Sequence, residues 1–225
     1  MNGFPDLEKV TKTLADPSRL NILTTLIDGK FHTVNELAKN AKIKSHTASY
    51  HLKQLYELNW ISSHKQGKHV YYRLCSEDIA ELLEKLMNLS PIKKIQSFNQ
   101  NSEYQKLKEG RSCYKHLAGK LGVSFFNYLI KHQFIEWEND SLILTDRGFH
   151  YFESIGVNIL YIKKQSGIFI KPCLDWTERD FHLSGNLGKA FFNLCEEKKY
   201  ITTNTANRSV RLTSSGEQFF LLFNS

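Results

Sequence analysis

A stretch of twenty residues occurs twice in the second half of the chain. The segment HLAGKLGVSFFNYLIKHQFI (116–135) aligns without a gap with HLSGNLGKAFFNLCEEKKYI (182–201). Each copy is followed by a Leu-Thr pair and then by a glycine: Leu144-Thr145 with Gly148, and Leu212-Thr213 with Gly216. A register that holds over twenty residues predicts two copies of one structural unit, which constrains the fold strongly because both copies must form the same elements.

In each copy, a glycine-spaced helix start precedes an aromatic helix, a strand-like pair and a further helix. Because this order is helix plus hairpin, we expect two winged-helix-like units, about 111–152 and 178–223, in a C-terminal domain of residues 111–225. The glycines should permit close helix packing or turns. Neither copy contains a strongly polar helix, so we do not expect these units to read DNA.

The first 90 residues have a different pattern. Asp16-Pro17 is a helix N-cap followed by proline, Thr33 and Glu36 have capping-box spacing, and Ser45 is expected to cap a helix that ends near Leu58. Alternating residues around Gln66-Gly67-Lys68 predict a hairpin, and a helix should begin after Ser76. This order predicts a winged helix-turn-helix domain over residues 1–90, and the polar segment 91–110 is expected to be a linker. The fold class is mainly α with β-hairpin wings (α+β).

The charge is unevenly distributed along the 225 residues. Residues 1–75 hold eleven Lys/Arg against six Asp/Glu, whereas residues 76–225 hold nineteen against seventeen. The N-terminal third is therefore the part expected to face a polyanion. The start of the chain lacks a signal-peptide pattern, no stretch is apolar enough to span a membrane, and the four cysteines are scattered. We expect a cytoplasmic protein without a membrane partner.

Three quoted segments carry a family resemblance. LADPSRLNILTTL (14–26), TVNELAKNAKIKSHTASYHLKQL (33–55) and GKHVYYRL (67–74) resemble the arsenical-resistance repressor (ArsR) family of bacterial winged-helix regulators. The resemblance covers about residues 5–90. It implies a homodimer held by the first helix and the one from Ser76, with the helix from Ser45 as DNA reader and the hairpin as wing.

The helix from Ser45 is expected to pack Ala48, Leu52, Leu55 and Leu58 inward and to turn a polar face outward. Groove-facing helices use such hydroxyl, histidine and tyrosine side chains for base edges and phosphates. A metal site or a catalytic site fits less well, because His46 and His51 lie five residues apart on different faces. The residues predicted to contact DNA are Lys44, Ser45, His46, Thr47, Ser49, Tyr50, His51 and Lys53 of this helix and Lys65, Lys68 and His69 of the wing.

The family's metal sites do not carry over. The position of the paired cysteines in its third helix reads Val34-Asn35-Glu36-Leu37-Ala38, and residues 76–89 contain no histidine. The C-terminal half holds another constellation, Cys113, His116, Cys173 and His182, at the entrances to the two repeats. If the entrances pack together, these side chains suit zinc or redox sensing. Two alternatives are structural histidines with buried cysteines, and an organic effector pocket lined by Trp176 and Arg179.

These observations predict a dimeric DNA-binding transcriptional regulator, a repressor rather than an activator, that binds a near-palindromic operator and senses an effector in its C-terminal region. No cofactor is identified. A second hypothesis is an architectural DNA-binding or protein-interaction protein without an effector. A third hypothesis is a metal-dependent enzyme in the C-terminal half that the winged helix directs to DNA. It would need zinc with an open coordination position near Asp175 or Glu178. Because no nucleophile–base pair or phosphate loop is evident, we do not expect an enzyme.

Overall fold

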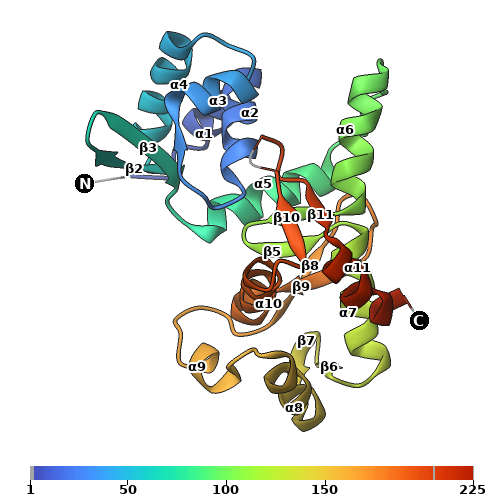
Figure 1. Cartoon of the computed structure of the whole chain (residues 1–225). Coiled ribbons are helices and arrows are strands. Elements are labelled where there is room, and N and C mark those ends of the chain that lie inside the picture. The colour runs from blue at the N-terminus through green and yellow to red at the C-terminus, as the bar shows by residue number, and fades with distance from the viewer. Residues whose placement is uncertain (1–2, 205, 225) are drawn as a thin grey trace. The chain divides into compact units, whose positions relative to one another are not determined.

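The computed structural model describes residues 3–204 and 206–224, and the chain divides into two compact units, residues 1–83 and 84–225 (Figure 1). The division falls inside helix α5 (Glu77–Leu89), slightly before the boundary expected at residue 90. Within the described residues, none of the helices has the length and apolar character needed to cross a membrane.

Unit 1 is a winged helix-turn-helix, as predicted. Its strands form an antiparallel sheet in the order β1-β3-β2, in which β2 and β3 are the wing. The short strand β1 was not predicted, because two residues carry no readable alternation; it pairs His32 with Tyr72 and Thr33 with Tyr71. The elements before α5 are α1 (Leu7–Leu14), α2 (Pro17–Leu26), β1 (His32–Thr33), α3 (Val34–Asn40), α4 (Ser45–Glu57), β2 (Ile61–Gln66) and β3 (His69–Leu74).

Side-chain caps begin the first three helices of unit 1, α1 to α3. The Asp16 carboxylate accepts the backbone N–H groups of Ser18 and Arg19 at the start of α2, and both hydrogen bonds of the Thr33–Glu36 capping box are present. The predicted cap at Ser45 is wrong. Lys44 is the N-cap residue of α4 and makes no side-chain cap, while the Ser45 hydroxyl donates to Asn35 Oδ1 at 2.8 Å.

Apolar side chains from the helices and the wing form the core of unit 1. The inward face predicted for α4 is confirmed for Ala48, Leu52 and Leu55, which are buried. Leu58, the C-cap residue, is only half-buried. This packing fixes which face of α4 remains in solvent. The other buried apolar residues of the helices before α5 include Ile22, Leu23, Leu26, Leu37 and Ala38.

The described residues of unit 2 form four two-stranded hairpins. After α6 (Phe98–Glu109), the order hairpin, helix, hairpin, helix occurs twice. The first set is β4 (Arg111–Cys113), β5 (His116–Ala118), α7 (Lys120–Lys131), β6 (Ile135–Glu138), β7 (Ser141–Leu144) and α8 (Asp146–Ile155). Helix α9 (Ile159–Lys163) leads to the second set, β8 (Lys171–Leu174), β9 (Phe181–Ser184), α10 (Gly185–Glu197), β10 (Ile201–Thr203), β11 (Val210–Leu212) and α11 (Ser214–Phe220), and the 3-10 turn Leu221–Asn224 follows.

Two features of unit 2 differ from the sequence expectation. Segment 91–110, predicted as a linker, contains helix α6, whose Ser97 cap accepts the N–H of Gln100. None of its residues is fully buried, so it has no apolar stripe that the sequence could reveal. In addition, each repeat begins with a hairpin that was not predicted, so the order is not the simple helix plus hairpin expected.

The two repeats pack against each other through equivalent positions. Phe125 of α7 and Phe191 of α10 stack with ring centroids 3.7 Å apart. Strand β5 packs on α10 of the other repeat, and β9 packs on α7. A Cβ atom on Gly122 would lie 3.3 Å from Cβ of His182, and one on Gly188 would lie 3.4 Å from Cβ of His116. An added Cβ would lie still closer to a carbonyl oxygen of its own repeat, 2.2 Å from Leu117 for Gly122 and 2.5 Å from Leu183 for Gly188. These glycines therefore permit close packing within each repeat and also against the hairpin of the other.

We expect Gly148→Ala to destabilise unit 2 by at least about 2 kcal/mol, because the added Cβ would lie 1.9 Å from the carbonyl oxygen of Phe134. Chemical denaturation monitored by circular dichroism measures the change. Gly3→Ala is the matched control, since its Cβ would meet nothing within 4 Å. Equal stability of the two variants would contradict the tight packing described for Gly148.

Candidate nucleic-acid interface and buried Cys/His cluster

Helix α4 presents most of its predicted DNA-contacting side chains to solvent. Tyr50 is 60% exposed, and Thr47 is half-buried. The exposed face begins at the helix N-terminus, where backbone N–H groups without an intrahelical partner can donate hydrogen bonds to a phosphate. The other exposed members of the predicted set on this segment are Lys44, Ser45, His46, Ser49 and Lys53.

His51 is the exception, and the prediction that it contacts DNA is contradicted. Its side chain is buried, and its Nε2 atom lies 3.9 Å from Oδ1 of Asp16, the cap of α2. The reason is helical periodicity: His51 follows Ala48 by three residues and precedes Leu55 by four, which places it on the inward stripe. His51 is therefore part of the packing that positions α4.

The outward Tyr50 is held by a chain of hydrogen bonds that the sequence analysis missed. Gln54 donates to the Tyr50 hydroxyl at 3.0 Å, and Arg19 Nη1 donates to Gln54 Oε1 at 2.6 Å. The Arg19 guanidinium also donates to the carbonyl oxygens of Thr13 and Lys12. A side chain anchored at α1 and α2 thus orients a group on α4. No local sequence pattern marks Arg19 or Gln54 as a residue that orients Tyr50, so only the tertiary contacts reveal this role.

The wing carries an exposed cationic tip, as predicted. Lys65, Lys68 and His69 are all exposed, and the hairpin reverses at Gly67, whose φ of 59° suits glycine. Arg73, which was not in the predicted set, is also exposed and lies over the Phe31 ring at 4.7 Å. Long cationic side chains at a hairpin tip can reach phosphates on a duplex.

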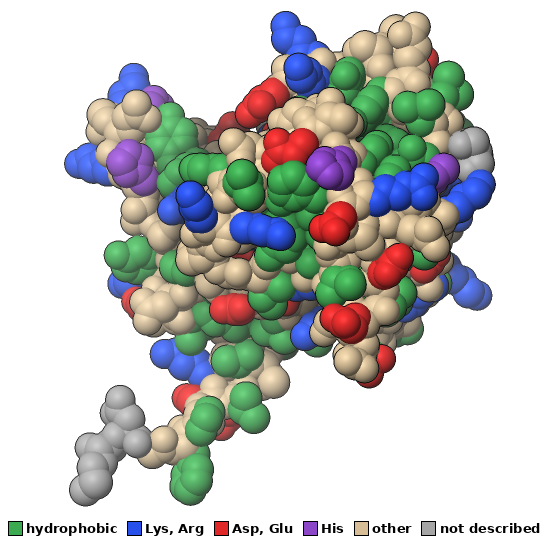
Figure 2. All heavy atoms as spheres, turned by 90° about the horizontal axis from the view of Figure 1, so that it is seen from below, with side chains coloured by type: hydrophobic (Ala, Val, Ile, Leu, Met, Phe, Trp, Pro, Cys, Tyr) green, Lys and Arg blue, Asp and Glu red, His purple; other side chains and the backbone are tan. Residues whose placement is uncertain are grey.

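On the face of the molecule drawn in Figure 2, basic and acidic side chains are interspersed over most of the surface, whereas basic and histidine side chains gather at its upper left end. A duplex backbone is attracted by a continuous basic surface. Most of this face therefore offers no continuous basic surface to DNA.

Unit 2 contains the second predicted group, Cys113, His116, Cys173 and His182. One ligand-type atom from each side chain lies within 4.8 Å of those from the other three. Each hairpin supplies one cysteine and the histidine directly opposite it, because Cys113 pairs with His116 and Cys173 pairs with His182. The two imidazole centroids are 5.2 Å apart. The structure therefore brings all four side chains together.

A buried carboxylate, Asp175, lies beside this cluster. Its oxygens are 3.3 Å from His182 Nδ1 and 2.9 Å from Arg111 Nη2, and all three side chains are inaccessible to solvent. Asp175 also accepts the N–H of Gly119 at 2.7 Å and the hydroxyl of Thr177 at 2.7 Å. The carboxylate thus fixes the orientation of His182 from outside the cluster.

Burial and mutual contact shift the pKa values of the cluster. The hydrogen bond with Cys113 and the nearby charge of His182 lower the pKa of the Cys173 thiol to about 5. The same hydrogen bond, together with burial, raises the pKa of Cys113. Burial lowers the pKa of His182, but Cys173 and Asp175 outweigh it and raise that pKa to about 9. The pKa of His116 falls well below its usual value because of burial and the charge of His182. At neutral pH, His116 is therefore an uncharged imidazole.

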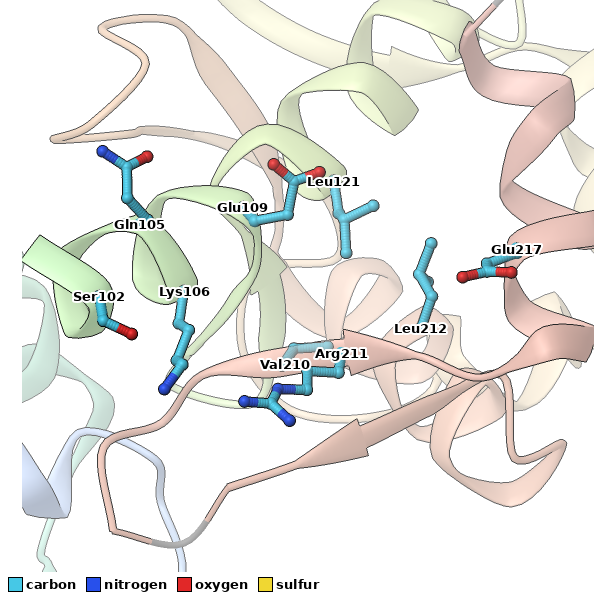
Figure 3. Close-up of a pocket in the computed structure, with 9 residues that line it drawn as sticks. All are labelled: Ser102, Gln105, Lys106, Glu109, Leu121, Val210, Arg211, Leu212 and Glu217. Carbon is cyan, nitrogen blue, oxygen red and sulfur yellow. The ribbon is translucent and has the colours of Figure 1, made fainter.

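Two of the hollows that open on unit 2 are lined in part by α6. One, of about 380 Å³, is lined by Tyr104, Trp176 and Arg179 among others, and so includes the two residues suggested for an organic effector. The other, of about 530 Å³, lies between α6 on one side and β11 and α11 on the other (Figure 3). Its charged lining has both signs, so it favours no single class of charged ligand: Lys106, Glu109, Arg211 and Glu217.

Comparison with known proteins agrees with the N-terminal architecture. Residues 16–63 match the family described as bacterial regulatory protein, arsR family. The chain is 37% identical over 216 residues to the uncharacterized HTH-type transcriptional regulator YdfF of Bacillus subtilis, a match covering 96% of each chain. It is also 37% identical over 75 residues to the biofilm growth-associated repressor of Agrobacterium fabrum, covering 33% of this chain and 63% of that protein.

Among solved structures, the transcriptional repressor BigR from Xylella fastidiosa is 28% identical and aligns with a TM-score of 0.36, covering 39% of this chain and 88% of that one. The match to YdfF extends over both units, whereas the match to the arsR profile lies within unit 1. The chain belongs to the ArsR family of HTH-type transcriptional regulators.

Proposed function

We propose that the chain is a homodimeric repressor that binds a near-palindromic operator through α4 and the wing and senses an effector in unit 2. The observation that carries the proposal is the exposed polar face of α4, which follows the helix-turn-helix corner and adjoins a cationic hairpin. In such domains the second helix enters the major groove, and its N-terminal residues contact base edges.

The side chains divide between two tasks. Short polar groups and Tyr50 on α4 are placed to read base edges, whereas lysines on α4 and the wing are placed to neutralise phosphates. Phosphate contacts give affinity that falls as salt rises, and base contacts give sequence preference. The proposed contact set is Lys44, Ser45, His46, Thr47, Ser49, Tyr50, Lys53, Lys65, Lys68 and His69.

Exposed apolar residues in unit 1 support dimerisation. Leu7 of α1 is 70% exposed, and Val10 and Leu14, which follow at helical spacing, are only half-buried. The only fully buried residue of α1 is Thr13. An amphipathic helix whose apolar stripe is not covered by its own chain is stabilised by a partner surface. A second copy provides that surface with two-fold symmetry, and a two-fold dimer binds two symmetric half-sites.

Repression follows from occupancy of a promoter, which excludes polymerase. An effector releases the operator only if it binds the DNA-free conformation more tightly than the DNA-bound one. The alternative is an architectural protein without an effector, and such a protein would bind duplexes with little sequence preference.

We expect Tyr50→Ala to weaken binding to a selected operator duplex about tenfold or more, because one base contact contributes about 1–3 kcal/mol. The free energy of unfolding should change by no more than about 0.5 kcal/mol, since Tyr50 is exposed. His51→Ala should instead lower the free energy of unfolding by about 1–2 kcal/mol, because His51 is buried.

Fluorescence anisotropy and chemical denaturation measure these two effects. Tyr161→Ala, at a tyrosine 63% exposed in unit 2, is the control and should alter neither. Unchanged operator affinity of the Tyr50 variant would argue against the reading face.

A separate test addresses the dimer. We expect Leu7→Asp to shift the protein from dimer to monomer at micromolar concentration, because it places a charge on the apolar stripe of α1. Leu160→Asp, at a leucine 63% exposed in unit 2, should leave the dimer intact. Sedimentation velocity distinguishes the two species. A Leu7 variant that sediments as the wild type would exclude α1 from the dimer interface.

A further inference from the structure

We propose that Cys113, His116, Cys173 and His182 bind one Zn²⁺ ion in a closed tetrahedral site that joins the two repeats of unit 2. All four residues belong to unit 2, and the inference does not depend on DNA binding. Four ligands of this type are a recurrent structural zinc set, and two cysteines with two histidines is one of its common compositions.

The geometry fits a small tetrahedral ion. With bonds of about 2.3 Å to sulfur and about 2.0–2.1 Å to nitrogen, the ligand atoms of a tetrahedral zinc lie roughly 3.3–3.8 Å apart. In this structure the four candidate atoms all lie within 4.8 Å of one another. An inward movement of about 1 Å or less therefore completes the site, which side-chain rotation can supply.

The backbone places the ligands in two matched pairs. Cys113 and His116 are opposite each other in β4–β5, and Cys173 and His182 are opposite each other in β8–β9. The glycines of α7 and α10 let each histidine-bearing strand approach the other repeat, which brings the two pairs face to face. The site therefore assembles only when both repeats are folded and packed together.

Buried nitrogen atoms in the cluster lack hydrogen-bond partners. Within the described part of the chain, His116 Nδ1 and both ring nitrogens of His182 are inaccessible to solvent and make no hydrogen bond, although His182 Nδ1 lies 3.3 Å from the Asp175 carboxylate. Buried polar atoms without a partner are rare and call for an explanation, such as an ion. Each histidine can supply one lone pair to a metal, which would account for its burial.

The surroundings of His182 match those of metal-binding histidines. Its Nδ1 faces Asp175, which leaves Nε2 on the side away from that carboxylate. Asp175 is itself held by Gly119 and Thr177, so the imidazole is oriented before metal arrives. Asp175 is thus a positioning residue.

Charge balance favours a divalent ion in this buried place. Binding of Zn²⁺ displaces the protons that Cys113 and His182 carry, and the two thiolates, two neutral imidazoles and one Zn²⁺ then sum to zero, whereas burial of an uncompensated charge is costly. A catalytic zinc ion keeps one coordination position open for water or substrate. Here all four ligands come from the protein, so the proposed site has no open position. The inferred role is to fasten the repeats together. Because Cys173 is only partly buried, it marks the side from which the ion can enter.

The test uses the full-length protein, stripped of metal by a chelator and kept reduced, and titrates it with Co²⁺ as a spectroscopic substitute for Zn²⁺. We expect one Co²⁺ per chain, visible bands of tetrahedral cobalt with a thiolate charge-transfer band, loss of these bands on adding Zn²⁺, and a higher melting temperature with Zn²⁺. Cys173→Ser should weaken cobalt binding at least tenfold, and Asp175→Asn should weaken it about 10- to 100-fold through His182.

Controls separate this site from accidental binding and from misfolding. Cys195→Ser and Cys75→Ser, which change cysteines outside the cluster, should bind cobalt as the wild type does. Circular dichroism checks that each variant is folded, and the wild-type titration needs no variant at all. A wild-type protein that gives no tetrahedral cobalt spectrum under reducing conditions would overturn the proposal. So would a Cys113–Cys173 disulfide that persists in reductant, or cobalt binding that survives in the folded Cys173 variant.

Discussion

The ion pair of Asp175 with Arg111, with His182 beside it, is the interaction on which the organisation of unit 2 depends. All three side chains are completely buried. Arg111 begins β4 in the first repeat, and Asp175 follows β8 in the second. Removing one member of a buried ion pair leaves the other charge buried without a counter-charge, which lowers the free energy of unfolding by about 3–5 kcal/mol.

The Asp175 carboxylate also accepts the N–H of Gly119, at the start of α7. The same residue therefore fixes the junction of the repeats, the beginning of a helix and the orientation of His182. This shared dependence explains why the Cys/His cluster lies where the two repeats meet.

Helical periodicity imposes a comparable constraint on unit 1. One stripe of α4 must pack on α2 and α3, so its opposite face is presented to solvent. His51 belongs to the packed stripe, and Tyr50, one residue earlier, belongs to the solvent face. Gln54, also on α4, donates a hydrogen bond to Tyr50, and Arg19 of α2 in turn donates one to Gln54. The recognition surface is thus positioned by the core and not by α4 alone.

Signals that are local in sequence predicted much of this structure. Caps at Asp16 and Thr33, the apolar stripe of α4 and the hairpin around Gly67 located the winged helix, and the repeat register placed His116 and His182 at equivalent positions. The hairpin β4–β5 was missed because its turn residues, Tyr114 and Lys115, have positive φ angles of 43° and 67° without the glycine or asparagine that usually signals such a turn.

Other features could be seen only in three dimensions. Helix α6 has no buried stripe, and the contacts of Asp175 with Arg111 and Gly119 join residues more than 50 positions apart in the chain. His51 lies on the packed stripe, as its spacing from Ala48 and Leu55 indicates, although a polar side chain in this helix is more typical of the solvent face.

Selection of duplexes from a random-sequence library by the purified full-length protein tests the central claim most directly. Sequence-specific recognition by a two-fold dimer predicts enrichment of an inverted repeat whose half-sites lie about one helical turn apart. Affinity for the enriched duplex should exceed that for a shuffled one by about 10³-fold or more at physiological salt. Absence of any enriched sequence, with equal weak binding to both duplexes, would contradict the account and favour an architectural role.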